Sequence, residues 1–344
     1  MANHEVESEP TSLRRGAPTV HDVARHAGVS PMTVSRVLSG GKNVRDGMKA
    51  KVDASIRALG YRRNENARSI RPGHTTGLIG VAVTNIANPY YAGVFLGIED
   101  VVNQHNRRIL VGNTNEDIGR ETQLIEDFIG RQVEGLILVP SSPVLDDSSP
   151  LVHAPFPLVL ASRALPGLDA DTVLIDDVHG SLKGTSMLIE EGHHRIAFLG
   201  NLLSVSTGRR RYEGFVQAHL DHNLVVDESL VRRGQQDVQS AQTAMADILD
   251  QPDPPTAVFS ANNRNTIGAV RALEASGLFP DHKFRIVGFD NFELAEIIPY
   301  PLTVIDHDPR ELGRRAATLL MARIDGVRRD EPSESIELST TLLA

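Results

Sequence analysis

The chain has 344 residues and a formal net charge of −9, so it is long enough for two or three domains with their own cores. No apolar run approaches the roughly 18 residues that a membrane span needs, and residues 1–10 lack the apolar core of a secretory signal. We therefore expect no membrane association and a cytoplasmic location. The chain contains 0 cysteines, which excludes disulfides and cysteine-based metal sites; its scattered histidines show no ligand spacing, so we expect neither metal nor cofactor.

Charge is distributed unevenly along the chain. Residues 11–73 contain 13 Lys or Arg and 4 acidic residues, a net charge of +9, which leaves −18 for the remainder. A basic module on an acidic body is typical of a protein that touches a polyanion at one end only. The alternative interpretation is a solvated basic face without a partner.

Two short helices are expected near the N-terminus. Apolar residues at helical spacing predict a first helix from about Val20, and Gly28 is suited to end it. Ser30 can cap a second helix that has Pro31 at its first position and Val34 on its buried side. A helix pair joined by a turn that contains glycine is the plan of a DNA-reading helix-turn-helix.

A third helix is expected over residues 48–59. Residues 62–71 are a helical candidate that is too short to be stable alone, because helix nucleation is costly. From residue 77 onward, near-continuous apolar strands alternate with helices, which is typical of parallel sheets covered on both faces. The expected strands are residues 78–83, 109–111, 135–139, 158–161, 173–175, 196–199, 257–259 and 286–289. The expected helices between them are residues 91–105, 121–130, 181–191, 209–219, 241–249 and 266–275.

These strands are too many for one sheet of this kind. We therefore predict an α/β core of two doubly wound parallel-sheet subdomains. Ligands of such folds bind at the carboxyl ends of the strands, so two subdomains would share one cleft.

Motifs spread over most of the chain point to one protein family. The run from Asp22 to Leu38 has the pattern of a helix-turn-helix, and residues 67–70 follow as Ala-Arg-Ser-Ile. Further along lie Arg211-Tyr-Glu-Gly-Phe and Gly-Phe-Asp290. Together these runs resemble the headpiece, the hinge and the sugar-binding core of the LacI/GalR (lactose/galactose repressor) family of bacterial transcription regulators. The resemblance covers about residues 18–340.

The resemblance implies a periplasmic-binding-protein-like type I core joined to a small all-α headpiece. Residues 1–17 are polar and aperiodic and should form a disordered tail. The expected regions are this tail, a headpiece at 18–63, a hinge helix and linker at 64–76, an N-subdomain at 77–175 plus 306–330, and a C-subdomain at 176–305 plus 335–343.

The resemblance also assigns candidate DNA contacts. Arg36 lies where a guanidinium can read the O6 and N7 atoms of guanine. Ile70 matches an apolar wedge that kinks the minor groove, and Ala67 is small enough for two hinge helices to approach. The alternatives are that Met32 fills the headpiece core and that the hinge is an inert linker. The full set is Thr19, His21, Pro31, Met32, Thr33, Ser35, Arg36, Asn64, Ala67 and Ile70.

Candidate effector contacts follow in the same way. Arg211 and Asp290 match a charged pair that grips ligand hydroxyls or a carboxylate; the alternative for Arg211 is a salt bridge on a helix face. Ser162 and Asn263 each stand where the family commonly has Asp. The full set is Tyr90, Tyr91, Ser162, Arg211, Asn262 and Asp290.

The sequence contains neither a phosphate-binding loop nor a nucleophile elbow, so we expect no enzyme. We expect a transcription regulator, most simply a repressor, that binds palindromic operator DNA as a homodimer and is controlled by a small-molecule effector, a sugar or polyol. Two alternatives stay open: a global regulator triggered by a protein partner, and a solute-binding protein without a DNA role.

Overall fold

The computed structural model describes residues 17–40, 44–62, 75–278 and 283–344. Its contacts divide the chain into two compact units, residues 1–74 and 75–344, and each is described by itself. The expected tail up to residue 16 and the hinge candidates lie outside the described residues; these candidates are Asn64, Ala67 and Ile70. No helix in the described ranges is both long and apolar enough to cross a membrane.

In its described residues, the first unit contains three short helices around a small core. They are α1 (Val20–Ala27), α2 (Pro31–Leu38) and α3 (Asp46–Leu59). Gly28, in the left-handed conformation with φ 67°, ends α1, and the Ser30 side chain caps α2. The predicted helix order and both boundary residues are therefore confirmed. The buried core comprises Val23, Ala24, Val34, Val37, Val52 and Tyr61.

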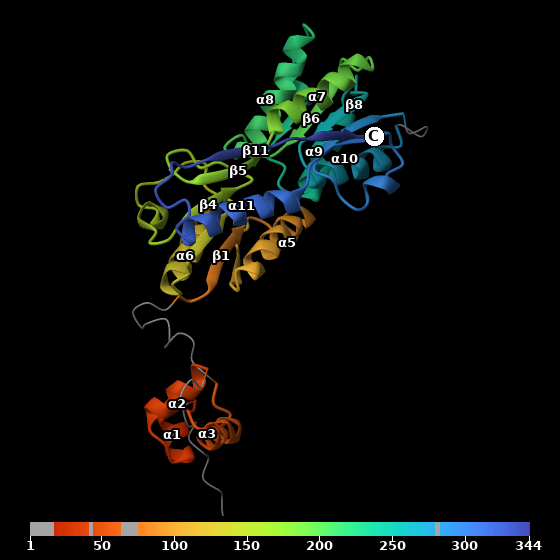
Figure 1. Cartoon of the computed structure of the whole chain (residues 1–344). Coiled ribbons are helices and arrows are strands. Elements are labelled where there is room, and N and C mark those ends of the chain that lie inside the picture. Colours follow the sequence, from red (N-terminus) through yellow and green to blue (C-terminus); the bar gives the residue numbers. More distant parts are fainter. Residues whose placement is uncertain (1–16, 41–43, 63–74, 279–282) are drawn as a thin grey trace, which may run out of the picture. The chain divides into compact units, whose positions relative to one another are not determined.

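The second unit contains two sheets, and the first is entirely parallel with the order β11-β5-β4-β3-β1-β2. Its strands are β1 (Leu78–Val83), β2 (Arg108–Asn113), β3 (Gly135–Leu138), β4 (Leu158–Ala161), β5 (Asp171–Ile175) and β11 (Ser335–Leu338). Alternate strand residues enter separate core clusters: Val81 packs with α5 (Pro89–Gln104) and α11 (Pro309–Ile324), whereas Ala82 packs with α6 (Ile118–Gly130). Helices therefore cover both faces of this sheet, with α5 and α11 side by side (Figure 1).

The second sheet has the order β12-β10-β9-β8-β6-β7 and is parallel except for β12. Its strands are β6 (Ile196–Gly200), β7 (Val231–Arg233), β8 (Ala257–Ser260), β9 (Arg285–Phe289), β10 (Leu302–Asp306) and β12 (Thr341–Leu343). Phe198 packs with residues of the helices on one face, and Leu199 with residues of the helices on the other. The covering helices are α7 (Asp177–Glu190) with α8 (Ser206–Asp221), and α9 (Val238–Leu249) with α10 (Asn263–Ser276).

The predicted fold of two doubly wound subdomains is confirmed, and every expected strand and helix of the core is present, most of them with shifted ends. The assignment of residues 335–343 to the C-subdomain is wrong in its first half, because β11 pairs with β5 of the first sheet. Only β12 joins the second sheet, beside β10. The chain thus changes subdomain at residues 339–340, a step that the polar and apolar pattern of two short strands does not reveal.

Candidate functional site

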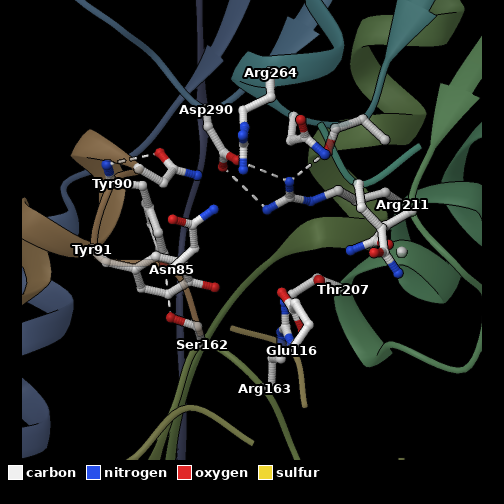
Figure 2. Close-up of a pocket in the computed structure, with 16 residues that line it drawn as sticks. Asn85, Tyr90, Tyr91, Glu116, Ser162, Arg163, Thr207, Arg211, Arg264 and Asp290 are labelled. Atoms are coloured by element: carbon white, nitrogen blue, oxygen red, sulfur yellow. Dashed lines mark hydrogen bonds and ion pairs between the residues drawn. The ribbon is translucent and has the colours of Figure 1, made fainter. Parts of the chain in front are cut away.

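A pocket lies between the two sheets, at the carboxyl ends of their strands (Figure 2). This is the position where doubly wound folds bind ligands. All six candidate effector residues line it: Tyr90, Tyr91, Ser162, Arg211, Asn262 and Asp290. The sequence analysis did not identify the other lining residues, which are Asn85, Asn88, Glu116, Arg163, Asn201, Thr207, Gly208, Gln236, Ala261 and Arg264.

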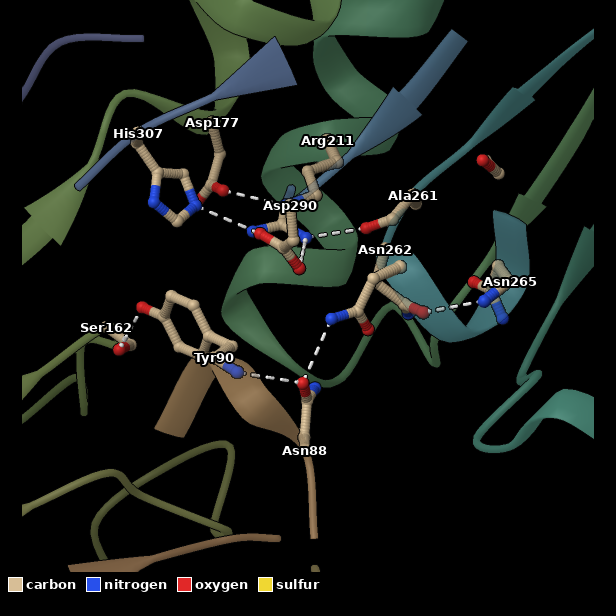
Figure 3. Close-up of polar contacts among 12 residues, drawn as sticks. Asn88, Tyr90, Ser162, Asp177, Arg211, Ala261, Asn262, Asn265, Asp290 and His307 are labelled. Carbon is tan, nitrogen blue, oxygen red and sulfur yellow. Dashed lines mark hydrogen bonds and ion pairs between the residues drawn. The ribbon is translucent and has the colours of Figure 1, made fainter. Parts of the chain in front are cut away.

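Arg211, on the first half of α8, is held from several sides (Figure 3). Its Nε donates to Asp177 Oδ1 at 2.8 Å, and Nη1 donates to the Ala261 carbonyl at 2.6 Å. Both terminal nitrogens also reach the carboxylate of Asp290, at 3.1 and 3.2 Å. The guanidinium carbon lies 3.7 Å from the ring centre of Phe289. With its side chain only 8% exposed, Arg211 belongs to a buried network and not to a solvated helix face.

The two carboxylates beside Arg211 differ in their electrostatics. Burial alone would raise the pKa of Asp290, but the Arg211 charge and the hydrogen bond from His307 lower that pKa to about 2. For Asp177, burial outweighs Arg211 and raises the pKa above the ordinary value. Asp290 therefore stays ionised at neutral pH and offers the pocket a strong hydrogen-bond acceptor.

The first subdomain contributes two tyrosines from the start of α5. Tyr90 Oη and Ser162 Oγ lie 2.6 Å apart, and Thr84 Oγ1 donates to Tyr91 Oη at 2.8 Å. The two rings meet edge to face, with centroids 5.0 Å apart. Burial raises the pKa of both phenols, so both remain neutral. Their contacts with Ser162 and Thr84 set the orientation of each hydroxyl.

Glu116, which is half-buried, forms a second ion pair at the pocket with the buried Arg163. Arg163 donates to both carboxylate oxygens at 2.7 and 2.8 Å, and its side chain is only 6% exposed. Burial would raise the pKa of Glu116, but Arg163 lowers it below the ordinary value. Sequence reasoning missed this pair because Glu116 lies in an irregular loop, 47 positions from its partner.

Three pocket residues adopt a backbone conformation that side chains other than glycine rarely take. Glu116, Ser162 and Asp290 have φ values of 60°, 65° and 66°. Each follows a strand: β2, β4 and β9, respectively. Such conformations persist only where the surrounding structure enforces them, and they are frequent at functional sites.

One hydrogen bond joins the two subdomains at the pocket edge. Asn88, the N-cap of α5, accepts from the Tyr90 backbone N–H at 3.1 Å and from Asn263 Nδ2 at 3.0 Å. Asn263 is the first residue of α10 in the other subdomain. Its neighbour Asn262 caps α10 by accepting from the Asn265 backbone N–H.

In the headpiece, the start of α2 is exposed to solvent. Met32 is 65% exposed, so it does not fill the core. Pro31, Arg36 and His21 are also exposed, and Ser35 is half-buried. Arg36 forms no ion pair with any residue in the described ranges, which leaves its guanidinium available to a partner.

The two candidate threonines have local structural roles. Thr19 accepts from the Asp22 backbone N–H and donates to the Asp22 carboxylate at 2.7 Å, which completes a capping box. Thr33 Oγ1 lies 2.9 Å from Ser30 Oγ at the start of α2. Both hydroxyls thus lie at helix N-termini, where such groups stabilise the first turn.

Comparison with known proteins places both units in one family. Residues 19–64 match the family model of bacterial regulatory proteins, lacI family, and residues 185–343 match that of a periplasmic binding protein-like domain. The HTH-type transcriptional repressor CytR of Escherichia coli K12 is 30% identical over 310 residues, which is 90% of this chain and 91% of CytR.

Two solved structures show the same likeness over almost the whole chain. The transcriptional regulator CelR in complex with cellobiose is 30% identical with a TM-score of 0.68, covering 95% of this chain and 98% of that one. The lac repressor dimer bound to operator and the anti-inducer ONPF is 25% identical with a TM-score of 0.77, over the same shares. This chain therefore belongs to the LacI family of bacterial regulatory proteins, and it is a DNA-binding transcription regulator, not an enzyme.

Proposed function

We propose that this protein is a repressor that binds a palindromic operator as a homodimer and responds to a neutral polyhydroxylated effector, a sugar or polyol, in the pocket between its subdomains. The observation that carries the effector class is the charge balance of the pocket. Its two buried arginines are already paired with carboxylates, Arg163 with Glu116 and Arg211 with Asp290.

The remaining lining groups suit hydroxyls. Amides, hydroxyls, the ionised Asp290 carboxylate and the half-buried Arg264 guanidinium present both donors and acceptors to the pocket. A buried site of this kind discriminates strongly against analogues that lack a hydroxyl, because its polar groups would then be left unpaired. The likeness to a regulator solved with cellobiose supports the same class.

The DNA side of the proposal rests on the exposed start of α2. The side chains that would contact base edges are the exposed Pro31, Met32 and Arg36. The half-buried Thr33 and Ser35 lie beside them. Two headpieces would read two half-sites, as the two-fold symmetry of a dimer requires. The likeness to a repressor solved as a dimer on its operator supports this arrangement. Because its operator is chromosomal DNA, the protein would act in the cytoplasm and associate with the nucleoid when bound.

The switch would act through the angle between the subdomains. An effector that binds better at one angle raises the population of the conformation with that angle. A coupling free energy of about 1–3 kcal/mol between effector and operator binding is ordinary for such systems. By linkage, the operator must change the effector affinity by the same factor.

The test combines a ligand screen with operator selection. Thermal melting of the full chain is measured with pentoses, hexoses, disaccharides including cellobiose, polyols and nucleobases; a ligand at 100 times its Kd adds about 2.7 kcal/mol. Operator sites are selected from random DNA, and we expect two inverted half-sites.

Arg211→Met should abolish the ligand response, whereas Arg209→Met should keep it. Arg209 lies on the same helix in an exposed pair with Glu213, which makes it a matched control. Stabilisation only by nucleobases, or by none of the compounds, would refute the effector class; the absence of any selected site would refute the repressor.

A further inference from the structure

We propose that His307 is a positioning residue that couples the ligand-facing carboxylate of Asp290 to the angle between the two subdomains. The inference rests on the proposed function and adds a residue that links the pocket to the switch.

The place of His307 in the chain is the first reason. Among the described residues the chain crosses between the subdomains after β5, after β10 and after β11. His307 follows β10 of the second sheet directly, and two residues later α11 begins to cover the first sheet. A side chain on this crossover belongs to neither subdomain alone, so its contacts can report their relative position.

The contacts of His307 supply the second reason (Figure 3). Its Nε2 lies 3.0 Å from Asp290 Oδ1, and the side chain is only 1% exposed. Its ring stands edge to face against Tyr90, with centroids 5.5 Å apart and planes at 82°, and also contacts the Phe289 ring at 5.9 Å. Tyr90 belongs to the first subdomain, whereas Asp290 and Phe289 belong to the second.

The protonation state of this pair follows from the chemistry of Asp290. An ionised carboxylate only accepts hydrogen bonds, so Nε2 of His307 must carry the proton and donate it. The other ring nitrogen, Nδ1, is buried and has no hydrogen-bond partner in the described ranges. The imidazole therefore contacts the second subdomain through its hydrogen bond to Asp290 and through the Phe289 ring, and the first subdomain through the Tyr90 ring.

These contacts form a continuous path across the pocket. It runs from Ser162 through Tyr90, His307 and Asp290 to Arg211. A change in the angle between the subdomains must alter either the ring contact with Tyr90 or the hydrogen bond to Asp290. The binding of a ligand at Asp290 and the angle between the subdomains are thereby linked through the His307 side chain.

Two substitutions separate the two contacts. His307→Gln keeps an amide N–H donor for Asp290 but removes the ring, whereas His307→Phe keeps a ring for Tyr90 but removes the donor. If His307 couples the subdomains, both variants lose the coupling. If it only orients Asp290, Gln suffices; if it only fills space, Phe suffices. The control is His222→Gln at the C-terminal end of α8, where the ring lies 2.8 Å from the Ala218 carbonyl of its own helix and 3.8 Å from Glu190.

The absence of cysteine allows a direct measurement without any effector. Cysteines replace two exposed residues, Glu126 on α6 and Leu220 on α8, one in each subdomain. The full chain is spin-labelled, diluted with unlabelled chain, and the distribution of distances between labels is measured by pulsed electron resonance. Operator affinity is measured on the same variants, and thermal melting verifies that each is folded.

We expect both His307 variants to shift or broaden the distance distribution and to change operator affinity by about fivefold or more, the lower end of ordinary allosteric coupling. The control should match the parent. A parental distribution and affinity in either His307 variant would overturn the inference, and if one variant fails to fold the other decides alone. The outcome does not depend on the identity of the effector, whereas the proposed function fails separately if no polyhydroxylated compound stabilises the protein.

Discussion

Replacing Asp290 with Asn tests whether the pocket carboxylate is held ionised by its surroundings. Asn has nearly the same shape and tolerates the left-handed backbone of this position, φ 66°. Arg211 keeps Asp177 and the Ala261 carbonyl, so no buried guanidinium is left without a partner. The substitution therefore removes one charge and little else.

The size of the effect follows from the pKa of Asp290. A pKa of about 2 against the ordinary value of 3.8 corresponds to about 2 kcal/mol of stability at neutral pH. Because the pKa is lowered in the folded state, this stability is fully present above about pH 4 and disappears as the pH falls through 2. The Asn side chain also removes the repulsion between Asp290 and Asp177, whose pKa is raised partly by Asp290. The expected loss of stability is therefore at most about 2 kcal/mol.

Urea unfolding of the full chain, followed by circular dichroism because there are 0 tryptophans, measures the difference between parent and variant. We expect Asp290→Asn to lower the free energy of unfolding by up to about 2 kcal/mol at pH 7 and by progressively less toward pH 3. Asp147→Asn, at an exposed loop aspartate, is the control. An equal difference at pH 7 and pH 3 would refute the electrostatic reasoning.

Arg36→Ala should weaken operator binding by about 1–3 kcal/mol and flatten the preference at one base pair per half-site, measured by fluorescence anisotropy on single-base operator variants; a uniform loss across sequences would show a phosphate contact instead. Operator affinity should fall with salt at a log–log slope of roughly −7 to −9 if two headpieces each neutralise four or five phosphates, and a slope shallower than about −3 would mean that only one headpiece engages. Glu116→Gln should destabilise the core by about 3–5 kcal/mol, because it leaves the buried Arg163 charge without a carboxylate; in urea unfolding, adding Arg163→Met should recover most of this loss, and no recovery would place the cost elsewhere.

Much of the fold could be predicted because its signals are local. A buried parallel strand such as β1 is a continuous apolar run, and helices on both faces make such runs recur at regular intervals. The headpiece could be predicted equally well from local signals. Glycine is suited to end a helix, as Gly28 ends α1, and serine is suited to begin one, as Ser30 caps α2. The position of the pocket followed from the parallel topology, which gathers the carboxyl ends of the strands.

What escaped prediction depends on partners that are distant in the sequence. β11 and β12 are short and lie at sheet edges, so no local pattern distinguishes the sheet that each one joins. Two further strands were missed: β7, which has only 3 residues, and β10. Glu116 carries no local sign of its pairing with Arg163, because only the folded loops bring them together. The same holds for His307, because its position on a crossover between the subdomains can be recognised only once the strand order of both sheets is known.

The strained residues explain why so much of the site is fixed before any ligand arrives. Glu116, Ser162 and Asp290 each hold an unfavourable backbone conformation that costs on the order of 1 kcal/mol or more. In return their side chains are already bonded to Arg163, Tyr90 and Arg211. A ligand then has little to order within either half of the pocket. Its binding energy is left to act on the angle between the halves, where the Asn88–Asn263 bond, the Arg210–Glu337 ion pair and the crossover contacts of His307 resist a change.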